Sequence, residues 1–246
     1  MSKKKIMILI VTILIVAVIA GIIIYRNSTY SLEEVKEMIT SGKETDNMHV
    51  IEEVKTEETT TAIYEQYKKD NLVYSITKDG NSKITGRTLY NKETQDYITI
   101  SDDEKIIIID KEEPKENKYG PTMATDSFMT VINSHAGADY EYCGKVKVDG
   151  KECIKVSLLN KNATERIEKD YYYINLEDNN VLKCENYIGT DANNLEKDSE
   201  LNYTYSFDTV KDEDMLHFDR ADFPDYQIFD NRTIGTRHFV RIHHNR

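Results

Sequence analysis

Hydrophobic side chains recur along this chain with three different spacings. An unbroken apolar run extends from Ile6 to Ile24. A short stretch after Ser31 then places apolar residues on one face of a helix, and from residue 47 onward apolar and polar residues alternate. These spacings are typical of a membrane helix, an amphipathic helix and a series of half-buried strands, respectively. The sequence therefore predicts a membrane segment followed by a body made mainly of β-strands.

The apolar run is long enough to span a bilayer. It includes Ile6, Leu14 and Ile24, and Thr12 is its only polar side chain. A helix of this length would extend roughly 28 Å, close to the ~30 Å hydrocarbon core. We expect residues 6–25 to be a single transmembrane anchor, residues 1–5 a cytoplasmic stub and residues 26–30 a linker.

Lysines at positions 3–5 precede this run, and only Arg26 follows it closely. The excess of positive charge before the run predicts a cytoplasmic N-terminus, so the body would lie outside the cell membrane. The alternative is a cleaved signal peptide, with Val18 and Ala20 as small residues before a cut at Gly21. The greater length of the apolar run favours the uncleaved anchor.

Two helices are predicted in the body. Ser31 and Glu34 form a capping box that starts the first helix, which ends near Gly42. The second covers residues 123–135 and ends before Gly137, and its apolar positions include those that we expect to plug the sheet or to face a ligand. Those candidate site residues are Met123, Phe128, Met129 and Ile132.

Alternating segments separated by turn residues predict about ten strands. The predicted strands begin near residues 47, 72, 84, 97, 106, 139, 151, 171, 181 and 201. In the last, we expect Leu201, Tyr203, Tyr205 and Phe207 to face the core. The predicted fold is mainly β (α+β): one curved antiparallel sheet, a half-barrel over residues 31–220, with both helices on its concave face.

Charge divides the chain further. The net charge is −12, which excludes nucleic acid as a main partner because phosphates would be repelled. The last sixteen residues reverse this sign, with four arginines and no acidic residue. We therefore predict a basic C-terminal extension over residues 221–246, disordered from residue 232.

The three cysteines do not form a disulfide framework. If Asp149 and Gly150 make a hairpin turn, residue 146 faces residue 153 and residue 143 faces residue 156. Cys143 and Cys153 then point to opposite faces of the sheet, whereas a bond from Cys184 to either remains open. Buried free thiols are the simpler expectation.

Nothing in the sequence indicates catalysis. The body lacks a Gly-rich phosphate loop and a G-x-S-x-G motif, and its histidines lie in no recognisable arrangement. We therefore expect a protein that is not an enzyme and holds neither cofactor nor metal.

The order of elements resembles the LolA/LolB/RseB superfamily of extracytoplasmic half-barrels. The resemblance covers residues 30–210 and is carried by two hairpins, residues 144–156 around Asp149-Gly150 and residues 171–185 around the turn at 177–180. Within that superfamily the acidic, Tyr-rich body is most similar to clostridial relatives of the germination lipoprotein GerS. That likeness implies a non-enzymatic partner of a cell-wall amidase in spore cortex modification, although the family's lipid-anchor cysteine is absent here.

Two functions follow as expectations. The first is a membrane-anchored adaptor that docks a protein partner, such as a peptidoglycan amidase. The second is a carrier or sensor that binds an acyl chain or lipopeptide in the hollow of the sheet. A fixed anchor argues against a shuttling carrier, and the many tyrosines favour contact with protein or glycan, so the adaptor is the first expectation.

Overall fold

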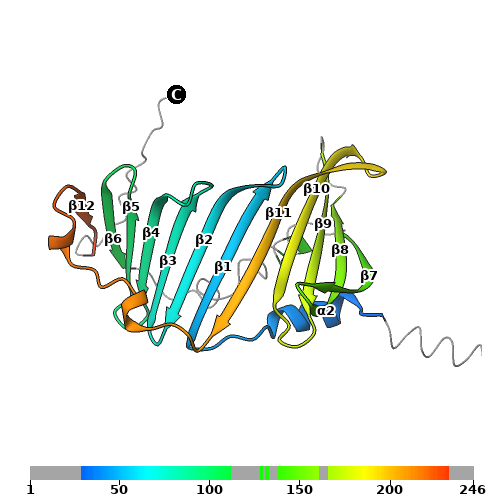
Figure 1. The fold of residues 1–246 in the computed structure, drawn as a ribbon, viewed down its shortest axis with the longest axis horizontal. Helices are drawn as coiled ribbons and strands as arrows, with labels where there is room; N and C mark the ends of the chain where they lie inside the picture. Colours follow the sequence, from blue (N-terminus) through cyan, green and yellow to red (C-terminus); the bar gives the residue numbers. More distant parts are fainter. Residues whose placement is uncertain (1–28, 112–127, 130, 133–137, 161–165, 233–246) are drawn as a thin grey trace, which may run out of the picture.

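A computed structural model describes residues 29–111, 128–129, 131–132, 138–160 and 166–232. Its main feature is one curved sheet of 12 strands (Figure 1). The strand order is β12-β6-β5-β4-β3-β2-β1-β11-β10-β9-β8-β7. The predicted mainly-β architecture, built on one large open sheet, is confirmed.

Most neighbouring strands are consecutive hairpins. The strands are β1 (Asn47–Thr56), β2 (Thr59–Lys69), β3 (Leu72–Asp79), β4 (Ile84–Asn91), β5 (Asp96–Ser101), β6 (Ile106–Lys111), β7 (Asp139–Val148), β8 (Lys151–Asn160), β9 (Ile167–Asn175), β10 (Val181–Asp191), β11 (Asn194–Phe207) and β12 (Gln227–Asp230). The helical elements are α2 (Leu32–Thr40) and the 3₁₀ turns η1 (Asp212–Asp214) and η2 (Arg220–Asp222).

Helix α2 begins at the predicted capping box. The Ser31 hydroxyl accepts a hydrogen bond from the Glu34 backbone N–H at 3.3 Å, and the Glu34 carboxylate accepts one from the Ser31 N–H at 2.7 Å. Two otherwise unpaired backbone donors are thereby satisfied. The helix buries Val35 and Ile39 against the sheet.

The pairing of β1 with β11 joins the β1–β6 meander to the β7–β11 meander. In the β7–β8 hairpin, Val146 faces Cys153 as predicted. The predicted pairing of residue 143 with residue 156 is wrong, because a bulge after Tyr142 brings Tyr142 opposite Val156. Gly144 has a φ of +111° at this bulge, a conformation that glycine adopts without steric cost.

The sheet contains two strands that the sequence pattern did not reveal. The first, β2, lies at its centre between β1 and β3. The second, β12, runs parallel to β6 at one edge, so the prediction of a wholly antiparallel sheet is wrong there. The domain end that we predicted at residue 220 therefore falls before a strand of the same sheet.

The two larger of the three clusters of buried apolar residues lie on opposite faces of the sheet. Helix α2 packs on one face over β8–β11, and this face is called the α2 face below. Residues 208–226 pack on the other face over β3–β6 and bury Val210, Met215 and Phe223; this is called the opposite face. Each end of the body thus covers a different half of the sheet, on a different side (Figure 1).

Residues 208–226 are held to the sheet by a polar cluster as well. The Arg87 guanidinium binds the Asp102 carboxylate through two hydrogen bonds. The Tyr226 hydroxyl donates to the same carboxylate at 2.7 Å. Asp102, which lies in the turn after β5, is therefore largely buried and paired.

No helix within the described ranges is long and apolar enough to cross a membrane. The predicted anchor with Ile6, Leu14 and Ile24, the first half of the predicted helix with Met123, and residues 233–246 lie outside those ranges. Residue 232, where we predicted disorder to begin, lies inside them. The Arg232 guanidinium binds the carboxylates of Asp230 at 2.7 Å and Asp96 at 3.3 Å.

Candidate ligand-binding face

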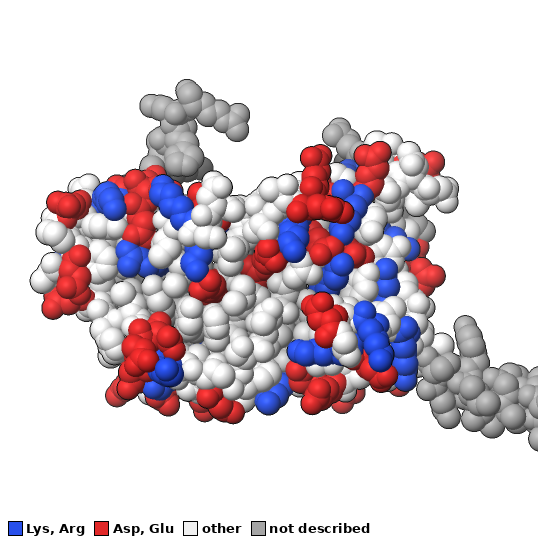
Figure 2. All heavy atoms as spheres, in the orientation of Figure 1, with Lys and Arg blue, Asp and Glu red and all other residues white. Residues whose placement is uncertain are grey.

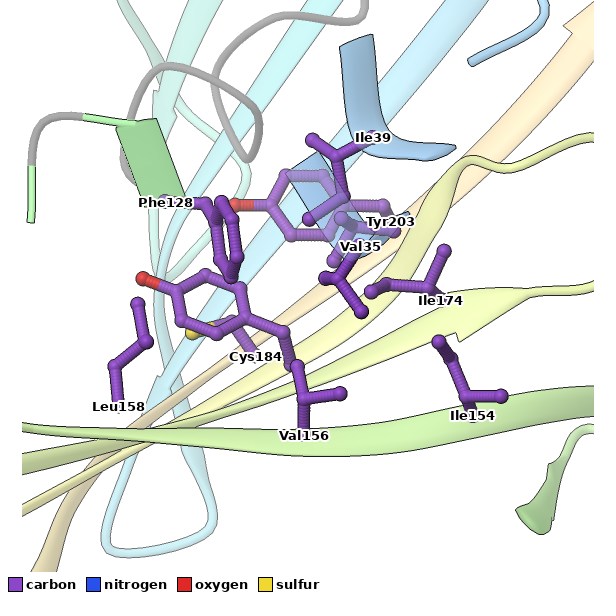
Figure 3. Close-up of a cluster of buried hydrophobic side chains, with 11 residues drawn as sticks. Val35, Ile39, Phe128, Ile154, Val156, Leu158, Ile174, Cys184 and Tyr203 are labelled. Atoms are coloured by element: carbon purple, nitrogen blue, oxygen red, sulfur yellow. The ribbon is translucent and has the colours of Figure 1, made fainter. Parts of the chain in front are cut away.

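The α2 face is lined by rows of aliphatic and aromatic side chains. Val35 and Ile39 point from α2 toward Ile174 and Tyr203 of the sheet (Figure 3). The buried members of this core are Val35, Ile39, Phe128, Ile154, Val156, Leu158, Tyr172, Ile174, Val181, Cys184 and Tyr203. The surface is therefore chemically similar to an acyl chain along most of its length.

Three of the four predicted plug residues can be placed. Phe128 is fully buried, and its ring meets the Tyr172 ring edge to face at 5.0 Å between centroids. Met129 and Ile132 pack against the same core and are partly exposed. Phe128 therefore fills the space over β8 and β9, while its helical neighbours form the border of that filled region.

The apolar rows continue onto the central strands. Val50 and Val54 of β1 lie opposite Tyr205 and Leu201 of β11 on the same face. Leu201, Tyr203 and Tyr205 belong to or pack against the core, as the alternation along β11 predicted. Phe207, the fourth predicted residue, lies on the same face and stacks on Tyr205, but it is only half-buried and is not a member of that core. This part of the face lies beside the region that α2 and Phe128 cover.

A carboxyl group interrupts the apolar row of β1. Glu52 lies between Val50 and Val54 on β1 and opposite Tyr203 on β11. Only 5% of the residue is exposed, and its Oε2 atom has no hydrogen-bond partner within the described part of the chain. Burial raises the pKa of Glu52 to about 7, because the apolar surroundings disfavour the charged form. Such a group is costly to bury and is usual only where it has a task.

The opposite face of β8–β11 has a different chemistry. The Lys155 ammonium lies over the Tyr171 ring at 4.1 Å and near the Tyr173 ring at 4.9 Å. The Tyr173 hydroxyl donates to the Glu185 carboxylate at 2.6 Å. Figure 2 shows lysine and acidic side chains interleaved over this part of the sheet. We use the name lysine–tyrosine lattice for the following side chains: Lys155, Tyr171, Tyr173, Lys183, Glu185, Lys197 and Glu200.

Glu200 shows how strongly this lattice is paired. It accepts hydrogen bonds from Lys197 at 2.5 Å, and its carboxylate lies 2.9 Å from the Lys183 ammonium. Burial opposes ionisation of this carboxyl, but the hydrogen bonds from Lys197 and Lys183 outweigh it and hold the pKa of Glu200 at about 2. The lattice is a polar, partly exposed surface with fixed charges.

Neither Glu52 nor the lattice was predicted as a site. For Glu52 the signal was present, since Met48, Val50 and Val54 form an alternating apolar row in which position 52 is the one acidic member. For the lysine–tyrosine lattice the signal in the sequence was weaker, because the residues of the lattice come from four strands and the sequence does not show how these strands pair.

Metal and disulfide chemistry are not indicated. In the ranges that the structure describes, no group of three or more His, Cys, Asp or Glu side chains could hold a metal ion. Cys143 is exposed, Cys153 and Cys184 are buried, and all three are free thiols. The open alternative of a bond from Cys184 is thereby settled in favour of free thiols.

Comparison with known proteins yields only a distant likeness of fold. No known family and no curated protein sequence matches the chain. An uncharacterised conserved protein of Thermus thermophilus is similar over 82% of this chain and 99% of its own, at 11% identity and a TM-score of 0.47. No comparison supports a specific closeness to GerS-related proteins.

Two further solved structures are similar at lower scores. The Mycobacterium tuberculosis lipoprotein LppX covers 74% of this chain and 99% of its own, at 9% identity and a TM-score of 0.36. A LolA superfamily protein of Nitrosomonas europaea covers 76% and 98%, at 8% identity and a TM-score of 0.28. The likeness therefore extends to lipoprotein and LolA-superfamily structures, at TM-scores too low to carry a functional assignment.

Proposed function

We propose that this chain is a membrane-anchored, extracytoplasmic binding protein without enzymatic activity, and that it takes an acyl chain or lipopeptide on the α2 face. The observation that carries this proposal is the apolar layer on the α2 face of β8–β11, which Val50 and Val54 extend onto β1 on either side of Glu52. Among the described residues, the nine-residue helix α2 and the helical residues around Phe128 pack against this layer.

This surface suits an acyl chain for a physical reason. An apolar layer between a sheet and a short helix makes contacts by dispersion and excludes water, and a methylene chain gains about 0.8 kcal/mol for each CH₂ that it buries there. Ligand sites of this kind are mostly apolar with few polar groups. Glu52 is such a polar group on the α2 face.

The test uses the full-length chain in phosphatidylcholine nanodiscs with a diazirine-bearing palmitate. After illumination, the labelled peptides are identified by mass spectrometry. We expect labels on β1 around Val50 and Val54 and on β11 around Leu201. The predicted membrane segment, residues 6–24, serves as an internal reference because lipid labels it in any case.

A matched pair of variants sharpens this test. Val54→Trp fills the border of the α2 face and should lower the labelling of β11 several-fold, whereas Ile51→Trp adds the same ring on the opposite face and should leave it unchanged. Labelling confined to residues 6–24 in the wild-type chain would contradict the proposal.

A second candidate function is docking of a cell-wall amidase during spore cortex modification or germination. The lysine–tyrosine lattice favours it, because it places tyrosines such as Tyr171 on a partly exposed face, and tyrosine is enriched at protein interfaces. If this function holds, Lys155→Glu together with Lys183→Glu should weaken binding to a purified amidase at least tenfold in interferometry. The same double change should leave acyl labelling of the α2 face intact.

A further inference from the structure

Glu52 indicates which kind of amphiphile the α2 face selects. We propose that the Glu52 carboxylate binds the ammonium group of an amine-bearing amphiphile whose apolar chain lies along β1 and β11. This inference rests on the proposed function, since it adds a head group to the acyl ligand.

The first step is that Glu52 has no hydrogen-bond or ion-pair partner among the residues that the structure describes. Its Oε2 atom is buried without a hydrogen bond. Lys55 of β1 pairs with Glu53 at 3.2 Å, and Lys68 of the neighbouring strand β2 pairs with Glu44 at 2.5 Å, so neither lysine pairs with Glu52. The Glu52 carboxyl can therefore accept hydrogen bonds from a bound ligand.

The second step concerns the chemistry of the head group. A carboxylate accepts hydrogen bonds and carries negative charge, so a ligand ammonium offers both N–H donors and the opposite charge. A fatty-acid carboxylate or a phosphate would instead place a second negative charge beside Glu52, in surroundings where charges are weakly screened. An alcohol would donate one hydrogen bond without neutralising the charge.

The third step concerns the apolar chain of the ligand. Val50 and Val54 flank Glu52 along β1, and Tyr203 lies across from it on β11. Leu201 and Tyr205 continue the apolar surface on either side of Tyr203 and are only partly buried. A chain attached to a head group at Glu52 thus has apolar side chains along the strand in both directions.

The experiment compares competitors that differ only in the head group. Full-length protein in phosphatidylcholine nanodiscs is labelled with the diazirine palmitate at pH 8, in the presence of decylamine, decanol or decanoic acid. We expect decylamine to halve the labelling of β1 and β11 at a concentration at least tenfold lower than decanoic acid, with decanol between them.

Two variants separate a specific site from general attraction of amines to an acidic protein. Glu52→Gln should abolish the advantage of decylamine while still allowing acyl labelling. Glu53→Gln removes the same charge from the next residue, on the opposite face, and should keep the advantage.

Each outcome is decisive. If decanoic acid competes as well as decylamine, or if Glu52→Gln keeps the preference for the amine, the role of Glu52 is refuted while acyl binding stands. If β1 and β11 of the wild-type chain are not labelled at all, the proposed function itself fails, and this inference fails with it.

Discussion

A glutamate that is buried without a partner costs free energy of folding. Glu52 is 95% buried, and one of its oxygens makes no hydrogen bond. Replacing such a group by an apolar side chain of similar size removes the desolvation cost, which is about 1–3 kcal/mol. We expect Glu52→Leu to raise the melting temperature, measured by circular dichroism at pH 8, by several degrees. A fall in melting temperature would show that the carboxyl has a stabilising partner.

The same residue predicts a dependence of stability on pH. The pKa of Glu52 rises from 4.5 to about 7 on folding, so the folded state holds this proton more tightly than the unfolded state. Its stabilising contribution is complete below pH 4.5 and is lost as the pH rises through 7, a change of roughly 3 kcal/mol. The free energy of unfolding should therefore fall with pH in the wild-type chain, relative to Glu52→Gln, in urea titrations. Parallel pH profiles for the two proteins would contradict this.

Tyr205 combines packing with one hydrogen bond. It packs against the α2-face core, and its hydroxyl donates to the Val181 carbonyl at 3.0 Å. We expect Tyr205→Ala to lower the free energy of unfolding by roughly 3–5 kcal/mol, and Tyr205→Phe by about 1 kcal/mol. Chemical denaturation measures both. Equal effects of the two changes would mean that the ring contributes little.

At the scale of elements, β12 joins the C-terminal region to the sheet. Its four residues pair with β6, and Ile228 packs against the core on the opposite face. Deleting residues 227–246 should expose part of that core and lower the melting temperature by several degrees. Deleting residues 232–246 alone should leave it nearly unchanged, because the partly exposed ion pairs that this removes, such as that of Arg232 with Asp96, contribute only about 0–1 kcal/mol each. A drop of several degrees for the shorter deletion would show that the tail is part of the fold.

The elements that the sequence predicted and those it did not differ in physical character. Strands with a clear apolar row, such as β1 and β11, were predictable because one of their faces is buried against a core. Strand β2 begins with Thr59, Thr60 and Thr61 and continues with glutamate, glutamine and lysine. It is held by backbone pairing with strands on both sides and by partial burial, which leaves no alternation to read.

Strand β12 was missed for another reason. It has four residues, and it pairs with β6 from a distant part of the sequence rather than through a hairpin. The candidate site shows the same limit: the alternation places Glu52 on the apolar face, but whether its oxygens find a partner depends on strands β2 and β11 on either side. The spacing of apolar residues along a strand predicts which face of the sheet a side chain lies on. The strands that pair with it determine which side chains surround it.

For the whole molecule, the predicted anchor gives a direct test. If residues 6–24 form an uncleaved transmembrane helix, cell fractionation should leave the full-length protein in the membrane pellet. Alkaline carbonate should fail to extract it, because burial of the apolar run holds it in the bilayer. A soluble form beginning near Gly21 would identify the run as a cleaved signal peptide.

The pairing of β1 with β11 also determines when folding can be completed during synthesis. Val50 cannot meet Tyr205 until the ribosome has made nearly the whole body, and the segment that covers β3–β6 is made later still. Contacts between residues so far apart in sequence form slowly, because a long loop must close first. We therefore expect the two meanders to stay unpaired during synthesis until β11 has been made.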